Sequence, residues 1–256
     1  MPPMVLTFAA SDPTGGAGVQ ADLLTIAALD CHPLSVITGL TVQDTRGVAR
    51  MMAVESEWVR SQAQHLVADM KIAAFKAGVL ASAANVRVVN EIVAAQAGVP
   101  VVLDPVLTSG RGDPLAADDV LDAMRKYLLA RTTVLTPNSI EARRLAGESG
   151  LAACARRLLD YGCKYVLITG THEATDEVVN TLYDAAGVVR EDRWPRLLGE
   201  YHGSGCTLAS AIAARLAHGS PAAEAVREAQ DFTWHALEAG FRAGRGQLLP
   251  HRFHRR

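Results

Sequence analysis

The chain has 256 residues, 49% of them hydrophobic, which is enough for one large α/β domain or two small ones with a sizeable core. Its formal net charge of -2 gives no support to nucleic-acid binding, and four cysteines without Cys-x-x-Cys spacing indicate free thiols in a reducing compartment. Neither a signal-peptide pattern nor an apolar stretch of about 18 residues is found, so we expect a cytoplasmic protein with no membrane segment and no nucleic-acid partner.

Apolar runs and helical periodicity alternate along the chain. The runs predict strands at 5–9, 34–37, 47–54, 74–77, 99–104, 133–136 and 165–168, and a hairpin over 178–189. The periodic segments predict helices from 19 to 29, at 55–70, 85–97, 117–129 and 138–161, and throughout the chain after Gly205.

Strands that alternate with helices predict an α/β fold, with a mostly parallel central sheet and helices on both faces. No Ser/Pro-rich linker, long charge run or internal repeat interrupts the chain, so residues 1–256 are expected to form a single domain. In such sheets ligands bind outside the carboxyl ends of the strands. Functional side chains are therefore expected directly after strands.

The segment 201–207, Tyr-His-Gly-Ser-Gly-Cys-Thr, carries the most specific local signal. The backbone N–H groups of Gly203, Ser204 and Gly205 can converge at the N-terminus of the following helix, where partial positive charge favours an anion. Cys206 would lie beside that anion, and the helix dipole is expected to favour its thiolate form. A base next to an anion site is what phosphoryl transfer to an alcohol requires. The alternative is an ordinary tight turn with Cys206 as a small buried hydrophobe.

Two further polar segments are expected to follow the first and second strands. The glycine-rich loop 11–18 allows the backbone to approach a ligand closely, and Asp22, on the helix behind it, can reach back toward the loop. Asp22 can equally be a solvated acid near the start of that helix. Gln43, in the segment 41–47, offers donors and an acceptor to the edge of a heterocycle, or it is part of a polar loop tip.

Acidic and amide side chains follow two of the most apolar strands. Asp104 ends the strand 99–104, where an unpaired carboxylate is costly to bury and a metal-bridged phosphate would satisfy it. Asn138 and Glu141 have the spacing of a capping box and are also oxygen ligands of the kind that Mg²⁺ takes; the two interpretations are compatible. The basic tail 251–256 is interpreted as a solvated end, with at most a weak role toward phosphate.

Taken in order, these segments resemble the hydroxymethylpyrimidine/phosphomethylpyrimidine kinases of thiamine biosynthesis, within the ribokinase-like superfamily. The matching segments are 11–22, 41–48, 76–80, 102–106, 112–115, 136–141 and 202–207. The resemblance implies a ribokinase-like three-layer sandwich and transfer of the ATP γ-phosphoryl group, with Mg²⁺, to the hydroxymethyl group of an aminopyrimidine. In many members of the family the monophosphate is phosphorylated as well. The resemblance also implies a homodimer.

The resemblance assigns a role to individual residues of this chain. Those implied to act in catalysis are Cys206, as the base toward the substrate hydroxyl, and Gly203, Ser204 and Gly205, as the anion hole. Those implied to contact the pyrimidine are Asp22, Gln43 and Val106. Those implied to contact the nucleotide are Asp104, Asn138, Thr169 and Thr207, and those implied to hold the metal are Asn138 and Glu141.

Three positions of this chain lack a residue that could contribute to such a site. No equivalent of a substrate-binding glycine at position 10 is present, because the residue there is Ala10. Gly110 and Thr169 stand where lysines are usual in the family, so two ammonium groups that would neutralise nucleotide phosphate are missing. Arg111, beside the first of these, is not equivalent to lysine because its guanidinium is planar. Since such cations stabilise charge in the transition state, their loss is expected to lower the rate and to leave the fold unchanged.

Two alternative functions stay open. A pyridoxal-kinase-like enzyme of the same superfamily would use the same Gly-Ser-Gly-Cys segment on another ring, whereas a non-catalytic relative would bind the pyrimidine without turnover. Asp22 beside Gln43 favours the aminopyrimidine, because the pair offers both an acceptor and donors to an amidine-like edge. The presence of Cys206, Asn138 and Glu141 argues against a non-catalytic protein.

Overall fold

The computed structural model describes residues 1–108 and 115–254, and within these residues nine strands form one sheet. The strands are β1 (Met4–Ser11), β2 (His32–Asp44), β3 (Gly47–Ala53), β4 (Ile72–Ala77), β5 (Val101–Leu103), β6 (Val134–Leu135), β7 (Tyr165–Ile168), β8 (Glu177–Asp184) and β9 (Gly187–Pro195). The helices are α1 (Gly18–Ala28), α2 (Ser56–Asp69), α3 (Ala83–Ala94), α4 (Asp118–Ala123), α5 (Ser139–Ala146), α6 (Leu151–Asp160), α7 (Ser204–Ala217) and α8 (Ala222–Glu238). A π-helical turn (Met124–Leu128) and a 3₁₀ turn (Leu129–Arg131) continue α4.

The central strands of the sheet are parallel, as predicted. The strand order is β3-β2-β1-β4-β5-β6-β7-β8-β9. Each pair from β2 to β7 is parallel, whereas β3, β8 and β9 run antiparallel to their neighbours. A sheet of this kind is normally covered on both faces, because its strands are apolar on both sides.

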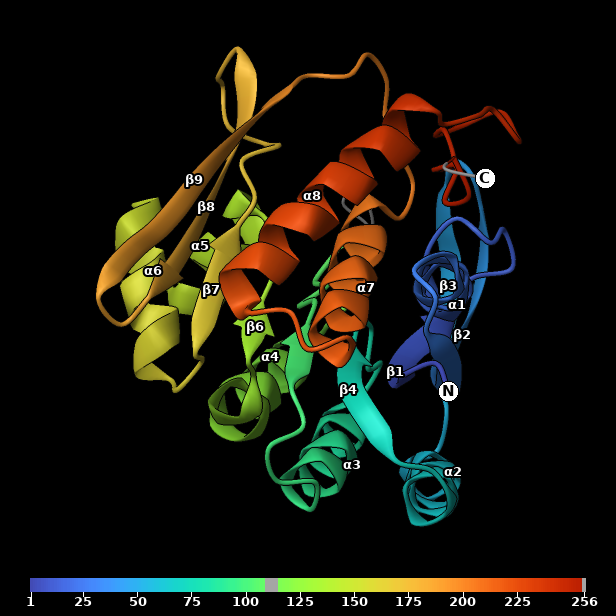
Figure 1. The fold of residues 1–256 in the computed structure, drawn as a ribbon. Helices are drawn as coiled ribbons and strands as arrows, with labels where there is room; N and C mark the ends of the chain where they lie inside the picture. The colour runs from blue at the N-terminus through green and yellow to red at the C-terminus, as the bar shows by residue number, and fades with distance from the viewer. Residues whose placement is uncertain (109–114, 255–256) are drawn as a thin grey trace.

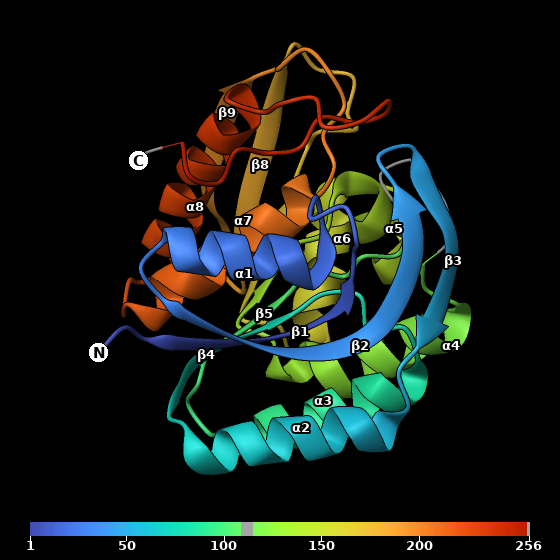
Figure 2. The same cartoon turned by 90° about the vertical axis from the view of Figure 1, so that its right-hand side faces the viewer.

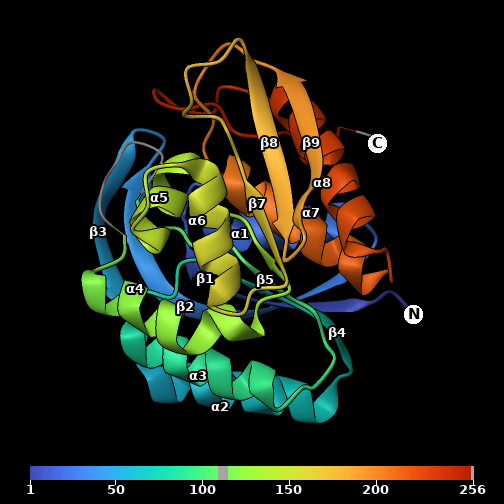
Figure 3. The same cartoon turned by 90° about the vertical axis from the view of Figure 1, so that its left-hand side faces the viewer.

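Helices do cover both faces of the sheet (Figure 1). Helices α1, α7 and α8 pack on one face, in a core that includes Val5 and Ala74. Helices α2 to α6 pack on the other face, against Leu6 and Phe75. Figure 2 shows α1 beside α7, and Figure 3 shows α5 and α6 on the opposite side of the sheet. Neighbouring residues of one strand therefore serve different cores, because their side chains alternate between faces.

The prediction of one helix over 138–161 is wrong. Two helices, α5 and α6, occupy this range. Gly147 adopts a left-handed conformation, with φ of 72°, and its N–H donates to the carbonyl of Arg143, which ends α5. Glycine is the residue that takes this conformation at least cost.

The prediction of helix throughout the chain after Gly205 is wrong beyond Glu238, where α8 ends. The following segment returns as extended chain and makes isolated bridges through Leu248 to Tyr201 and through Leu249 to Phe241. Among the residues that the structure describes, no helix has the length and apolarity needed to cross a membrane.

The second strand is longer than the predicted 34–37. Strand β2 continues to Asp44, so Thr41 and Gln43 lie inside the strand and not in a loop that follows it. Strand β3 pairs with this extension, with Gln43 opposite Val48. Ladder hydrogen bonds to β3 therefore hold these polar residues in an extended conformation.

Candidate active site

Four polar residues follow parallel strands of the sheet, as predicted: Asp12 follows β1, Asp104 follows β5, Asn138 follows β6 and Thr169 follows β7. Because parallel strands end at one edge, these residues share it. Asn138 and Thr169 form a backbone bridge. Asp104 lies against the first turn of α7, where a Cβ added to Gly205 would be 3.6 Å from Asp104 Oδ2. The structure thus brings Asp104, at the end of β5, to the N-terminus of α7.

The turn before α7 is closely packed and requires glycine. Gly203 is the N-cap of α7 and has a φ of 79°. A Cβ at this position would lie 1.9 Å from the carbonyl oxygen of Gly16, on the glycine-rich loop. Within the described residues no side chain caps the helix, so the N–H groups of Ser204 and Gly205, in its first turn, remain available to an anion.

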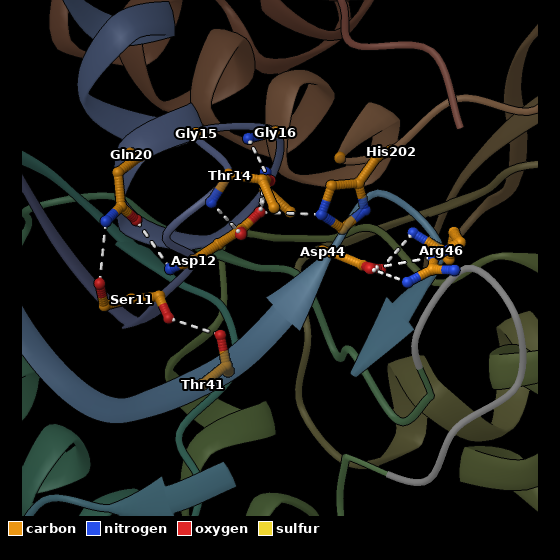
Figure 4. Close-up of polar contacts among 12 residues, drawn as sticks. Ser11, Asp12, Thr14, Gly15, Gly16, Gln20, Thr41, Asp44, Arg46 and His202 are labelled. Atoms are coloured by element: carbon orange, nitrogen blue, oxygen red, sulfur yellow. Dashed lines mark hydrogen bonds and ion pairs between the residues drawn. The ribbon is translucent and has the colours of Figure 1, made fainter. Parts of the chain in front are cut away.

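Asp12 and His202 join the two loops of the site (Figure 4). The Asp12 Oδ2 and His202 Nε2 atoms are 2.8 Å apart. Asp12 also accepts hydrogen bonds from the N–H groups of Thr14 and Ala17. Burial raises the pKa of Asp12, but the hydrogen bond from His202 and those from the backbone lower it by more, to about 2. The carboxylate therefore fixes the loop after β1 against the loop before α7.

Cys206 lies in the first turn of α7 and is buried. Burial raises the pKa of its thiol to about 12; the positive charge of Lys76 lowers it, while the carboxylates of Asp104 and Asp22 raise it further. The expectation that the helix dipole favours the thiolate of Cys206 is therefore wrong for the protein without bound substrates. The cost of burying a charge beside two carboxylates exceeds the effect of the dipole.

Asp104 is a buried carboxyl group, and one of its oxygens, Oδ2, has no hydrogen-bond partner among the residues that the structure describes. Burial raises the pKa of Asp104 to about 6, although Lys76 and the hydrogen bond from Cys206 both lower it. A buried oxygen without a donor is costly unless a ligand completes it.

Glu141 and Asn138 form the predicted capping box of α5. The Asn138 side chain accepts from the Glu141 N–H at 2.9 Å, and the Glu141 side chain accepts from the Asn138 N–H at 3.0 Å. Burial and the negative charge of Asp104 raise the pKa of Glu141 to about 8. Asp104 and Glu141 are thus two adjacent buried carboxyl groups. The described parts of the chain hold no group of three or more His, Cys, Asp or Glu residues that could bind a metal ion by itself.

Asp22 is completely buried, so the interpretation as a solvated acid is wrong. Its carboxylate accepts from Thr7 Oγ1 at 2.6 Å, from Ser210 Oγ at 2.8 Å and from Lys76 Nζ at 2.9 Å. All three donors belong to the protein interior. A direct contact between Asp22 and a pyrimidine would require one of them to leave.

Lys76 was not singled out from the sequence, although it lies at the centre of the charged groups around Cys206. It is completely buried in β4. Burial lowers the pKa of Lys76, but Asp22, Cys206 and Asp104 raise it by more, so that it lies above its ordinary value. The sequence does contain a signal for this role: a lysine lies inside the apolar run 74–77, and a buried ammonium group needs an anionic partner.

Three other predicted residues lie around this centre. Gln43 lines a cavity of about 400 Å³ beside the glycine-rich loop, and Cys206 is not among the residues that line it. Val106 is half-buried directly after Asp104. Thr207 Oγ1 donates to the carbonyl of Gly203 at 2.8 Å.

A glycine at position 10 has no part in the site, because the chain has none there. The residue is Ala10, which is buried near the end of β1. Its carbonyl oxygen faces Gly18, where an added Cβ would lie 2.3 Å from it. The backbone of Ala10 therefore packs against the start of α1, and this chain has no substrate-binding glycine at position 10. Gly110 and Arg111, and most of the segment 112–115, lie outside the described residues.

The basic tail is not a solvated end, because Arg252 is buried against the glycine-rich loop. Its guanidinium donates to the carbonyl of Gly16 at 2.6 Å and to Thr207 Oγ1 at 3.1 Å. The sequence gives no local signal for this contact, because the glycine-rich loop and Arg252 lie near opposite ends of the chain.

Solved structures of kinases share the whole architecture. The pyridoxal kinase of Bacillus subtilis, crystallised with ADP, has a TM-score of 0.90 at 26% identity and covers 98% of this chain and 97% of its own. The Staphylococcus aureus pyridoxal kinase with AMP-PCP and pyridoxal has a TM-score of 0.89 at 28% identity and covers 99% of this chain and 94% of its own. The fold and the site therefore define a ribokinase-like small-molecule kinase, and the predicted fold is confirmed.

Sequence comparison narrows this class to a family. The model of the phosphomethylpyrimidine kinase family matches residues 12–251. The hydroxymethylpyrimidine/phosphomethylpyrimidine kinase of Streptomyces coelicolor is 42% identical over 254 residues, which are 96% of this chain and 92% of that protein. The one from Rhizobium meliloti is 36% identical over 263 residues, which are 100% of this chain and 98% of that protein. The chain belongs to the phosphomethylpyrimidine kinase family and is a phosphotransferase, as the resemblance implied.

Proposed function

We propose that this kinase transfers the γ-phosphoryl group of ATP to the hydroxyl of 4-amino-5-hydroxymethyl-2-methylpyrimidine, and also phosphorylates the resulting monophosphate, in thiamine biosynthesis. The observation that carries the proposal is the first turn of α7. There an uncapped helix N-terminus formed by Gly203, Ser204 and Gly205 adjoins the Cys206 thiol and the Asp104 carboxyl group. Family membership supplies the substrate class.

Cys206 is the proposed base toward the substrate hydroxyl. Its thiol is protonated in the free protein, so the proton must leave Sγ before this atom can accept another. Asp104 accepts a hydrogen bond from the thiol and is the adjacent proton acceptor. The positive charge of Lys76 stabilises negative charge on Cys206 and Asp104. The proton of the substrate hydroxyl then moves to Sγ as the hydroxyl oxygen bonds to the γ-phosphorus. The bond from that phosphorus to the bridging oxygen breaks, ADP leaves with this oxygen, and the anion hole binds the transferred group.

The pyrimidine ring is proposed to lie between Gln43 and Val106. Gln43 lines a cavity beside the glycine-rich loop, and its amide can donate to and accept from the ring edge. Val106 offers an apolar contact. We assign Asp22 an indirect part through Lys76, because its oxygens are engaged by protein donors.

The nucleotide phosphates are proposed to lie near Asp104, Asn138, Thr169 and Thr207. Mg²⁺ fits the same edge of the sheet, because Asp104 Oδ2 is a buried oxygen without a partner and Glu141 is an adjacent carboxyl group. Glu141 and Asn138 would hold the ion, directly or through water. When bound, Mg²⁺ neutralises phosphate charge.

We further propose that residues 1–256 act as one kinase domain, that the protein is a cytoplasmic enzyme and that it forms a homodimer. Sedimentation velocity of the purified chain tests the last point, and a monomer at every concentration would contradict it.

One assay decides the substrate. The protein is incubated with Mg-ATP and with the hydroxymethylpyrimidine, its monophosphate or pyridoxal in turn, and both ADP and the product's phosphorylation state are followed. Turnover of both pyrimidines supports the proposal. Pyridoxal as the only substrate, or pyrimidine binding without turnover in calorimetry, would contradict it and favour the pyridoxal kinase or the non-catalytic protein.

A further inference from the structure

The C-terminal segment 246–252 contacts three segments of the proposed site: the β2–β3 turn, the loop before α7 and the glycine-rich loop after β1. Its residues pair with the β2–β3 turn, where the Gln247 N–H donates to the Thr45 carbonyl at 2.8 Å. They also pair with the loop before α7, where the His202 N–H donates to the Leu248 carbonyl at 2.9 Å. Arg252 then reaches the third loop, the glycine-rich segment after β1.

Arg252 joins two loops through a single buried guanidinium. Its Nη2 donates to the Gly16 carbonyl at 2.6 Å and its Nη1 to the Gly15 carbonyl at 3.3 Å. Its Nε donates to Thr207 Oγ1 at 3.1 Å, and Thr207 Oγ1 donates in turn to the carbonyl of Gly203. The planar fork of arginine satisfies acceptors on both sides at fixed geometry, which an ammonium could not do.

The positions of these acceptors matter because they lie directly behind the anion hole. Gly203 and Gly16 are in close backbone contact, and Gly203 begins the helix that presents the Ser204 and Gly205 N–H groups. A small displacement of either loop would turn these donors away from a phosphoryl group. Preorganised donors stabilise the transition state only when their geometry is fixed in advance.

Arg252 also brings positive charge to the proposed site. Thr169, which is proposed to lie near the nucleotide phosphates, is uncharged. The guanidinium lies within electrostatic range of Cys206, Asp22 and Asp12. Arginine keeps its charge when buried, because its pKa stays far above neutrality.

We propose that Arg252 is a positioning residue for phosphoryl transfer: it fixes the glycine-rich loop against the first turn of α7 and supplies a buried positive charge behind the anion hole. The inference rests on the proposed function, because it requires a phosphoryl group at that helix terminus.

The test compares Arg252→Met and Arg252→Lys with Arg242→Met, a matched change at an exposed arginine that donates to the Gly246 carbonyl. For Arg252→Met we expect kcat to fall on the order of 100-fold, with little change in the KM of either substrate. Arg252→Lys, which keeps the charge and loses the fork, should recover part of this loss. Arg242→Met should behave as the unchanged protein. Millimolar guanidinium or ethylguanidinium should restore activity to Arg252→Ala.

A second measurement does not need turnover. Hydrogen exchange followed by mass spectrometry should show faster exchange of residues 12–18 and 201–207 in Arg252→Met, with the rest of the chain unchanged. A wild-type kcat in Arg252→Met, or unaltered exchange in both segments, would overturn the inference. If the unmodified protein phosphorylates no pyrimidine, the proposed function fails, and the exchange data still decide whether Arg252 fixes the two loops.

Discussion

Asp22 and Lys76 form an ion pair with both side chains completely buried, and the Nζ atom of Lys76 is 2.9 Å from Asp22 Oδ1. The pair joins α1 to β4 within electrostatic range of Cys206. Two opposite charges are tolerated there because each satisfies the other and because Thr7 and Ser210 donate to the carboxylate. The pair therefore links the stability of the fold to the electrostatics of the site.

Lys76→Met should lower the free energy of unfolding by about 3–5 kcal/mol, because it leaves the Asp22 carboxylate buried without its cation. The double change Asp22→Asn with Lys76→Met should recover much of this loss, since both charges are gone. Chemical denaturation measures both effects, and Lys71→Met, at an exposed position just before the same strand, is the control. Equal stability of Lys76→Met and the unmodified protein would show that the pair contributes nothing.

Cys206→Ala should lower kcat by about 10²–10⁴, because it removes the proposed base, while the affinity for the pyrimidine changes little. Steady-state kinetics and calorimetry separate the two effects. Cys163→Ala, at another buried thiol that packs in the core on the other face of the sheet, controls for loss of a buried sulfur. An unchanged kcat would remove Cys206 from the mechanism.

Acid should lower the free energy of unfolding by protonating Asp12. The folded-state pKa of about 2 lies below the ordinary value of 3.8, so the folded protein holds the carboxylate form more strongly than the unfolded chain does. The stabilisation is full above about pH 4 and is lost as the pH falls to about 2, and it amounts to about 2 kcal/mol. Unfolding measured across this window should show a shallower pH dependence for Asp12→Asn than for the unmodified protein. Asp69→Asn, at an exposed position, is the control, and parallel curves for Asp12→Asn and the unmodified protein would contradict the prediction.

Gly203→Ala should abolish activity and destabilise the protein, because the added Cβ would meet the Gly16 carbonyl and the residue would keep a positive φ. Gly219→Ala separates these causes, since Gly219 has a similar φ of 89° with open space around it. We expect Gly219→Ala to cost about 1–2 kcal/mol from the backbone alone and to leave kcat unchanged. Thermal unfolding and kinetics of the two variants check this, and equal behaviour would mean that the loop contact at Gly203 is unimportant.

The parallel sheet, its helical layers and most of the strand-end residues could be predicted from the sequence. Apolar runs such as 99–104 and 165–168 are local patterns, and so are the Gly-Ser-Gly-Cys turn and the Asn138–Glu141 capping box. Helix ends were less predictable: one glycine, Gly147, divides the predicted helix 138–161, because a local backbone conformation outweighed the periodicity.

The sequence by itself determined the layered α/β fold and the family, and it predicted the N-terminus of α7 as the anion site, since these depend on residues close together in the chain. Only the tertiary structure decided the protonation of Cys206, the burial of Asp22 with Lys76 and the place of Arg252. Each depends on contacts between distant segments, and burial reverses what the same side chains would do in water. A helix N-terminus that would favour a thiolate in solvent holds a thiol here, and an arginine near the chain end becomes part of the interior.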